Sequence, residues 1–216
     1  MKISTKNLSA SALICAFSYI LMIISKTIPA VSGFLQFDLK DIAVTIGGFV
    51  LGPLYAILIA FVVALLEFIT VSDTGLIGLI MNFISTAAFC GVASVIYSKK
   101  KTLKSAVLSL FLATISLTVI MLLWNYYITP LYMKIPRSTV ASMLIPVFLP
   151  FNLIKGLINS GLILILYKPV VSGLRRAGLL RANSKVAPKN FPITVIIGIV
   201  ILVISVPFLL SMIGLI

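Results

Sequence analysis

Residues 141–167 read ASMLIPVFLPFNLIKGLINSGLILILY, an apolar run in which Lys155 carries the only charge. A run of this length and composition is typical of a membrane-spanning helix. A cationic side chain at bilayer depth costs roughly 2.5 kcal/mol or more on insertion scales, so such residues usually face a bundle interior, a wet cavity or a ligand. Asn152 lies one helical turn before Lys155 and shares its face. The two side chains form a candidate polar patch directed at a bound molecule.

The rest of the 216-residue chain has the same character, with 61% hydrophobic and 10% charged residues. The apolar residues fall in long stretches, whereas a β-barrel would show alternating segments of about ten residues. We therefore predict an all-α integral membrane protein with one membrane domain. Hydrophilic segments are too short for a separate soluble domain, so any ATPase or catalytic module must be another chain.

The chain divides into seven expected spans. They lie at 8–28, 42–59, 54–70, 76–97, 103–127, 142–167 and 192–215. The second and third meet at Gly52-Pro53, where glycine permits unusual dihedrals and proline ends the preceding helix, so two shortened helices fit better than one long helix. We expect a membrane domain at 1–180, a basic cytoplasmic linker at 181–191 and an additional transmembrane helix at 192–216.

Basic residues are distributed unequally between the two sides of these spans. Twelve lysines and arginines fall on the side of the N-terminus, and four fall on the other, namely Lys26, Lys40, Lys134 and Arg137. The positive-inside rule then predicts a multi-pass protein of the cell membrane with a cytoplasmic N-terminus. Membrane topology also explains the net charge of +13 better than nucleic-acid binding does.

The outer side carries the acidic residues and two candidate covers. Asp38, Asp41 and Asp73 fall in expected outer loops, and Glu67 lies near the outer end of the third span. Residues 29–41 mix proline, glycine, aromatic and polar residues, which suits either a lid or an ordinary loop on the bilayer surface. The loop 128–141 is a second outer cover of the same kind.

Several chemistries are disfavoured. The chain has no P-loop motif, so pumping must draw on a partner or an ion gradient. It has no histidine, and Cys15 and Cys90 lie inside spans, so neither a disulfide framework nor a metal site is predicted, and no catalytic residue is expected. Four acidic residues without a histidine also disfavour an intramembrane enzyme. A secondary transporter usually carries several intramembrane acids and internal repeats, and the sequence shows neither.

A set of polar residues lies inside the expected spans: Glu67, Asn82, Asn125, Asn152, Lys155 and Asn159. An unsatisfied amide in an apolar interior costs roughly 1–3 kcal/mol, so these groups should pair with each other or with a ligand. Asparagine and lysine suit a planar heterocycle with alternating carbonyl and ring nitrogen groups. Alternatively, Lys155 pairs with Glu67 as a structural bridge.

Two further patterns allow two interpretations each. The aromatic residues Trp124, Tyr126 and Tyr127 either stack on such a ring or form an interfacial belt. Ala12 and Ala16 form a small-residue face on the first span, which lets helices approach closely in lipid. That face either docks another subunit or packs within the chain's own bundle.

Five segments together match a known pattern: Leu35-Gln-Phe-Asp-Leu-Lys-Asp41, Gly52-Pro53, Met81-Asn-Phe83, Leu123-Trp-Asn-Tyr-Tyr-Ile-Thr-Pro-Leu-Tyr132 and Leu149-Pro-Phe-Asn-Leu-Ile-Lys-Gly156. They resemble the riboflavin-binding S components of energy-coupling-factor (ECF) vitamin transporters, in the same order. Pro-Phe-Asn-x-x-Lys-Gly and Asn-Tyr-x-x-x-Pro-Leu-Tyr are the more specific elements.

The resemblance implies a six-helix substrate-binding subunit that holds riboflavin as transported ligand, without a cofactor, in an outward-facing cavity closed by the first outer loop. Its expected partners are a transmembrane coupling subunit and two cytoplasmic ATPases, with Ala12 and Ala16 taking part in docking. The expected ligand contacts are Leu35, Gln36, Phe37, Asn82, Asn125, Asn152 and Lys155.

The sequence departs from this pattern in two places. Glu67 stands where an amide is familiar in the family, and the stretch 192–215 adds a seventh apolar segment. An S component for another vitamin, such as thiamine or biotin, is the nearest alternative, and a secondary transporter is a more distant one.

Overall fold

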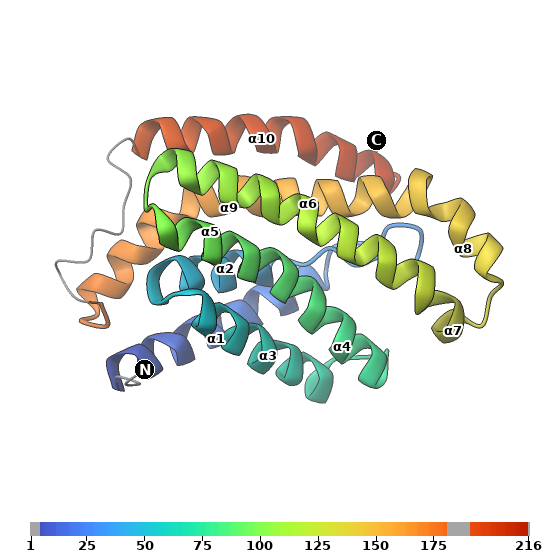
Figure 1. Ribbon diagram of the computed structural model, residues 1–216, viewed down its shortest axis with the longest axis horizontal. Helices are drawn as coiled ribbons and strands as arrows, with labels where there is room; N and C mark the ends of the chain where they lie inside the picture. The colour runs from blue at the N-terminus through green and yellow to red at the C-terminus, as the bar shows by residue number, and fades with distance from the viewer. Residues whose placement is uncertain (1–4, 181–190, 216) are drawn as a thin grey trace.

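The computed structural model describes residues 5–180 and 191–215, which form a bundle of long helices (Figure 1). The helices are α1 (Thr5–Ser25), α2 (Lys40–Leu51), α3 (Pro53–Thr70), α4 (Gly75–Thr86), α5 (Val92–Lys99), α6 (Leu103–Tyr127), α7 (Thr129–Met133), α8 (Arg137–Met143), α9 (Leu149–Arg176) and α10 (Phe191–Met212). Two π-helical turns, Ala87–Gly91 and Leu144–Phe148, join α4 to α5 and α8 to α9. The described residues include no strand, so the all-α prediction is confirmed.

Six of the described helical segments are long and apolar enough to cross a membrane. They are Thr5–Ser25, Pro53–Thr70, Gly75–Lys99, Leu103–Tyr127, Arg137–Arg176 and Pro192–Met212. The prediction for 42–59 was wrong in extent, because α2 ends at Leu51 and contains only 12 residues. At 1.5 Å per residue it is about 18 Å long, which is too short for a bilayer core of about 30 Å.

The break between α2 and α3 lies where the sequence predicts it. Gly52 has φ 109°, a backbone conformation that favours glycine, and Pro53 occupies the first turn of α3. The chain therefore reverses direction within one residue, and two short helices replace one long helix.

Small residues allow close packing in the centre of the bundle. A side chain at Gly156 of α9 would lie 2.6 Å from Thr114 Cγ2, so only glycine permits this approach to α6. Such contacts matter in lipid, where van der Waals packing rather than the hydrophobic effect holds helices together. Thr114 lies near the middle of α6, so Gly156 marks the approximate midplane of the bundle.

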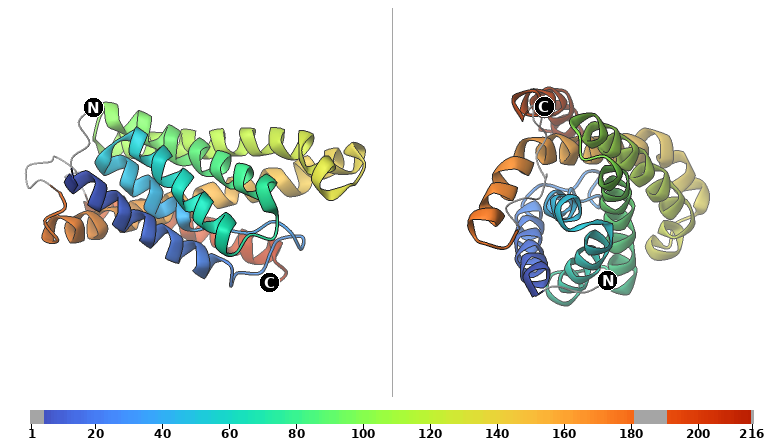
Figure 2. Two further views of the ribbon diagram at one scale, coloured as in Figure 1. Left: turned by 90° about the horizontal axis from the view of Figure 1, so that it is seen from below. Right: turned by 60° about the vertical axis from the view of Figure 1, so that its left-hand side comes forward.

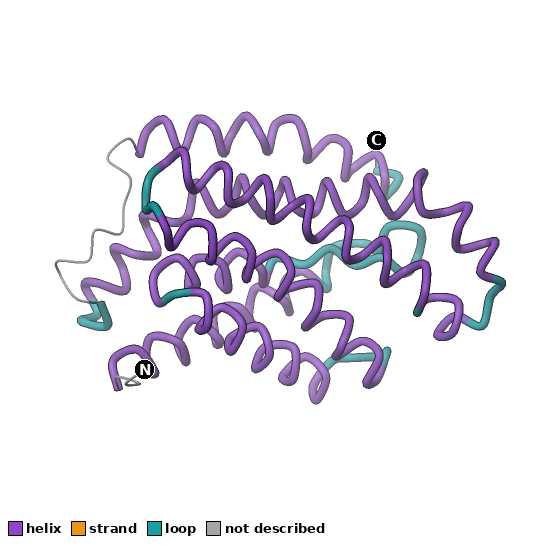
Figure 3. The backbone as a smooth tube through the Cα atoms, viewed as in Figure 1, coloured by secondary structure: helices purple, strands orange, loops and turns teal. Residues whose placement is uncertain are grey.

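The segment between α1 and α2, residues 26–39, is called the lid loop from here on. It is irregular and runs between the helices, as the teal trace in Figure 3 shows. Asn159 Nδ2 of α9 donates a hydrogen bond to the Asp38 carbonyl oxygen at 3.2 Å, which places the loop near the bundle midplane. The alternative of a loop on the bilayer surface was therefore wrong.

Two other expectations for the outer side are corrected. Asp41 is not in a loop: it lies in the first turn of α2 and is fully buried. The segment 128–141 is largely helical, because Pro130 begins α7 favourably and Pro136 precedes α8. Asp73 does lie in a turn, between α3 and α4.

The C-terminal apolar stretch forms the expected helix, α10. It lies along α9 on the side of the bundle opposite to α1, as Figures 1 and 2 show. The predicted linker at 181–191 falls almost wholly outside the described residues. Whether α10 crosses the membrane remains a prediction.

Candidate ligand-binding cavity

A cavity of about 330 Å³ lies between the lid loop, α4, α6, α7 and α9. Its volume is in the range of roughly 300–1,000 Å³ that small-molecule sites occupy. All seven predicted contact residues line it: Leu35, Gln36, Phe37, Asn82, Asn125, Asn152 and Lys155. The structure thus brings together residues from four separate segments of the chain, and their contact with a ligand remains a prediction.

Lys155 is buried, with 8% of its surface exposed. Its Nζ donates one long hydrogen bond, at 3.5 Å, to Ser85 Oγ of α4. No carboxylate of the described residues lies within salt-bridge distance of it. A buried ammonium with one weak protein partner retains two unused donors. Lys155 is therefore the strongest candidate to donate to a ligand.

Glu67 does not pair with Lys155, so that interpretation was wrong. The Glu67 carboxylate instead lies 3.1 Å from Lys26 Nζ and 2.9 Å from Lys40 Nζ. Both lysines flank the lid loop, and they approach the outer end of α3 because the loop folds inward. Two cations at one site favour a carboxylate, so Glu67 is paired within the protein.

The same lysines hold the lid loop itself. Lys26 Nζ donates to Gln36 Oε1 at 2.7 Å, and Lys40 forms an ion pair with Asp38. Burial disfavours the charged carboxyl of Asp38, but the attraction of Lys40 outweighs it and lowers the pKa of Asp38 below its ordinary value. This group of residues, Lys26, Gln36, Asp38, Lys40 and Glu67, is called the lid network below.

Local hydrogen bonds orient two of the three asparagines that line the cavity. Asn125 Nδ2 donates to the Met121 carbonyl at 2.7 Å, and its Oδ1 accepts from Thr129 Oγ1 at 2.8 Å. Asn152 Nδ2 donates to the Phe148 carbonyl at 2.8 Å. Each amide nitrogen keeps a second N–H, and each amide oxygen keeps a lone pair. The asparagines therefore offer fixed donors and acceptors beside Lys155.

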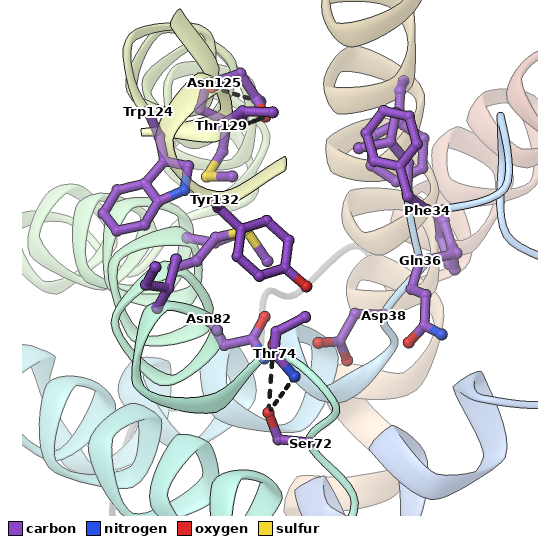
Figure 4. Close-up of a pocket in the computed structure, with 18 of the residues that line it drawn as sticks. Phe34, Gln36, Asp38, Ser72, Thr74, Asn82, Trp124, Asn125, Thr129 and Tyr132 are labelled. Carbon is purple, nitrogen blue, oxygen red and sulfur yellow. Dashed lines mark hydrogen bonds between the residues drawn. The ribbon is translucent and has the colours of Figure 1, made fainter. Parts of the chain in front are cut away.

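Aromatic side chains line opposite walls of the cavity. Figure 4 shows Trp124 and Tyr132 on one side and Phe34 on the other. The interpretation of an aromatic wall thus applies to Trp124. Tyr126 and Tyr127 are not in the cavity: their rings lie 5.0 Å apart, and Arg137 lies over both.

Several residues that line the cavity were not predicted from the sequence. Tyr132 closes the Asn-Tyr-x-x-x-Pro-Leu-Tyr element, so the motif contained a signal for it. Phe34 and Asp38 lie within the suspected lid but were not singled out. The turn between α3 and α4 adds Ser72 and Thr74, which no sequence pattern marked.

These groups can bind but have no arrangement for covalent chemistry. Among residues 5–180 and 191–215, no group of three or more His, Cys, Asp or Glu side chains could hold a metal. Lys26, Asp38 and Glu67 also line the cavity but pair with protein groups of the lid network. The amides, the Lys155 ammonium and the aromatic walls suit a flat molecule with hydrogen-bonding edges.

A family model described as "ECF transporter, substrate-specific component" matches residues 6–167. The chain belongs to this family. The S component is 30% identical over 178 residues to the riboflavin transporter RibU of Staphylococcus aureus (strain TCH60), covering 79% of this chain and 93% of that protein. It is 31% identical over 179 residues to RibU of Streptococcus thermophilus (strain ATCC BAA-250 / LMG 18311), covering 78% and 84%. It is 27% identical over 184 residues to the riboflavin transporter FmnP of Bacillus subtilis (strain 168), covering 80% and 97%.

A solved structure has the same fold. The chain described under "Structure and mechanism of the S component of a bacterial ECF transporter" matches with a TM-score of 0.66 and 30% identity, over 79% of the S component and 98% of that chain. The family match ends at residue 167, before α10 begins. Because the relatives are transport proteins, the prediction that this S component is not an enzyme is confirmed.

Proposed function

We propose that the S component captures riboflavin from outside the cell and releases it to the cytoplasm with energy from ATP hydrolysed by partner subunits. The observation that carries this proposal is the convergence of Lys155, Asn125 and Asn152 on a cavity with aromatic walls. The three relatives described above are named as riboflavin transporters, which supports the choice of ligand.

The chemistry of riboflavin fits the cavity. The polar edge of its ring system alternates carbonyl oxygens with ring nitrogens, which match the donors of Lys155 and the mixed groups of the asparagines. Trp124 and Phe34 offer surfaces for the apolar faces of the ring. Asp38, Ser72 and Thr74 offer oxygen acceptors for a hydroxylated side chain.

We place the cavity on the outer side of the cell membrane. The expected cytoplasmic lysines at 99–104 lie where α5 ends and α6 begins. These helix ends are the ones away from the cavity. Arg175 and Arg176 likewise end α9 far from Asn152. The positive-inside rule then gives a cytoplasmic N-terminus.

Docking to the coupling subunit is assigned to α1. Ala12 and Ala16 are exposed on this helix, next to exposed Leu13 and Phe17. They are therefore not used in packing within the chain, which favours the partner interpretation. Because α10 lies on the opposite side of the bundle, it leaves this face uncovered (Figure 2). The partners themselves, a transmembrane coupling subunit and two cytoplasmic ATPases, follow from the family.

We also propose that the chain divides into the regions expected from the sequence. Residues 1–180 form the substrate-binding membrane domain, and 192–216 add a further transmembrane helix. If α10 crosses the membrane, the C-terminus lies outside, whereas a surface helix would leave it inside. Labelling of a cysteine introduced after residue 212 by a membrane-impermeant reagent distinguishes the two.

Riboflavin titration of the purified protein tests the proposal. We expect saturable binding of one flavin and a flavin absorbance band in protein purified from riboflavin-containing medium. Thiamine and biotin should not compete. Binding of another vitamin in place of riboflavin, or uptake that survives loss of the ATPase partner, would support the alternatives.

A further inference from the structure

We infer that α10 is the lipid-side wall of the lid loop and that it slows release of the bound ligand. This inference rests on the proposed function, because it assigns α10 a role in holding the same ligand. It concerns a part of the chain beyond the family match, which ends at residue 167.

The position of α10 on α9 is fixed by two facing glycines. A side chain at Gly198 would lie 2.7 Å from the Gly161 carbonyl oxygen, and one at Gly161 would lie 3.0 Å from the Gly198 carbonyl oxygen. The two backbones therefore approach as closely as small residues allow, which is how helices associate specifically in lipid. Such an interface fixes the position of α10 against α9.

The outer half of α10 reaches the lid loop. Leu209, 7% exposed, belongs to one apolar cluster with Val31 and Phe37 of the lid loop and Phe151, Ile154 and Ile158 of α9. Leu202 and Met212 of α10 pack against the same cluster. The side of the lid that faces away from the cavity is thus covered by α9 and α10 together.

Phe37 links this cluster to the ligand cavity. It lines the cavity and is also a buried member of the cluster, and Phe151 has the same double position. A lid movement that opens the cavity on this side must draw Phe37 out of the cluster to which Leu209 belongs. The packing of Leu209 therefore opposes opening.

The irregular backbone of the lid loop explains why such a wall is useful. Non-helical backbone at membrane depth is tolerated only where protein surrounds it or where it lines a wet cavity. The lid loop reaches the level of Asn159, near the bundle midplane. One of its sides lines the cavity, and α10 shields another from acyl chains, which cannot satisfy polar backbone groups or offer fixed packing.

The test compares two variants of the full-length chain. Leu209→Ala removes the contact with the lid cluster, whereas Ile204→Ala removes a side chain that is 58% exposed on the lipid-facing side of α10. Bound riboflavin is released by dilution and followed by its fluorescence. We expect dissociation on the order of tenfold faster for Leu209→Ala and unchanged for Ile204→Ala, since changes within one interface act mostly on dissociation rates. Equal rates for the two variants would overturn the inference.

A second measurement does not depend on the ligand. Hydrogen exchange of residues 31–39 in the ligand-free protein should increase in Leu209→Ala and not in Ile204→Ala, with α6 unchanged as an internal reference for folding. Leu209→Ile, which keeps the volume, should restore slow exchange. Failure of riboflavin binding with these exchange differences intact would contradict the proposed ligand but not the role of α10, whereas binding without them would contradict the role of α10.

Discussion

The Glu67 carboxylate lies 2.9 Å from Lys40 Nζ, and both side chains are almost completely buried. This pair ties the outer end of α3 to the start of α2, and Lys26 extends it to the end of α1. The pairing occupies the one acidic residue predicted inside a span, so Lys155 is left to the cavity. Lys26 and Lys40 reach the Glu67 carboxylate and hold the lid loop, whereas Lys155 pairs with no carboxylate of the described residues.

Replacing Glu67 by Gln should destabilise the protein. The change removes one carboxylate from a buried site with two lysines, and breaking a buried pair costs about 3–5 kcal/mol. The midpoint of thermal unfolding in detergent measures the effect. Asp73→Asn, in an exposed turn, is the matched control and should leave the midpoint unchanged. A Glu67→Gln protein as stable as this control would show that the pair contributes nothing.

Replacing Lys155 by Met should weaken riboflavin binding without unfolding the protein. Lys155 makes one long hydrogen bond to the protein and no ion pair within the described residues, so we expect the Met variant to keep the fold. A hydrogen bond from a charged group contributes about 1.5–3 kcal/mol, which corresponds to roughly a tenfold to 150-fold loss of affinity. Calorimetric titration measures it, with Lys104→Met, outside the cavity, as control. If affinity is the same in both variants, Lys155 is a structural residue.

Substitutions of Trp124 and of Tyr127 should have different effects on riboflavin affinity, although the two residues are close in sequence. Trp124 lines the cavity, whereas Tyr127 lies outside it with Arg137 over its ring. Trp124→Leu should weaken binding by about 0.5–1.5 kcal/mol or more, the usual contribution of an aromatic pair beyond its buried area. Tyr127→Leu should bind like the unmodified chain. Calorimetry distinguishes them, and equal losses would contradict the placement of the ring between Trp124 and Phe34.

Bulky residues on α1 should block assembly and leave ligand binding intact. Ala12→Trp and Ala16→Trp fill the exposed small-residue face proposed for docking, which requires close helix approach. Co-purification with the coupling subunit and ATPases should fall, while riboflavin affinity stays unchanged. Val203→Trp, on the exposed side of α10, is the control. Normal assembly of the α1 variants would place docking elsewhere.

The fold could be predicted largely because bilayer thickness sets the length of an apolar helix. The break at Gly52-Pro53 was predictable for a local reason, since these two residues dictate their own backbone conformation. The start of α2 was not, because nothing close to Lys40 and Asp41 in the sequence shows that they are helical and buried. That burial depends on Glu67 and Thr86, which are distant in sequence.

The cavity, too, was predictable from the sequence only in part. The polar residues inside spans were predictable, because a buried amide or ammonium in lipid requires a partner. The partner of each one was not, as the wrong Lys155–Glu67 pairing shows: spacing along a helix gives the face of a residue but not the loop that reaches it. The inward path of the lid loop therefore had to come from the structure.

The central claim is that the cavity around Lys155 binds riboflavin. Titration of the purified full-length protein with riboflavin, followed by quenching of flavin fluorescence, tests it most directly. One saturable site, weakened in Lys155→Met and not displaced by thiamine or biotin, is the predicted result. The absence of saturable riboflavin binding by the folded protein would contradict the claim.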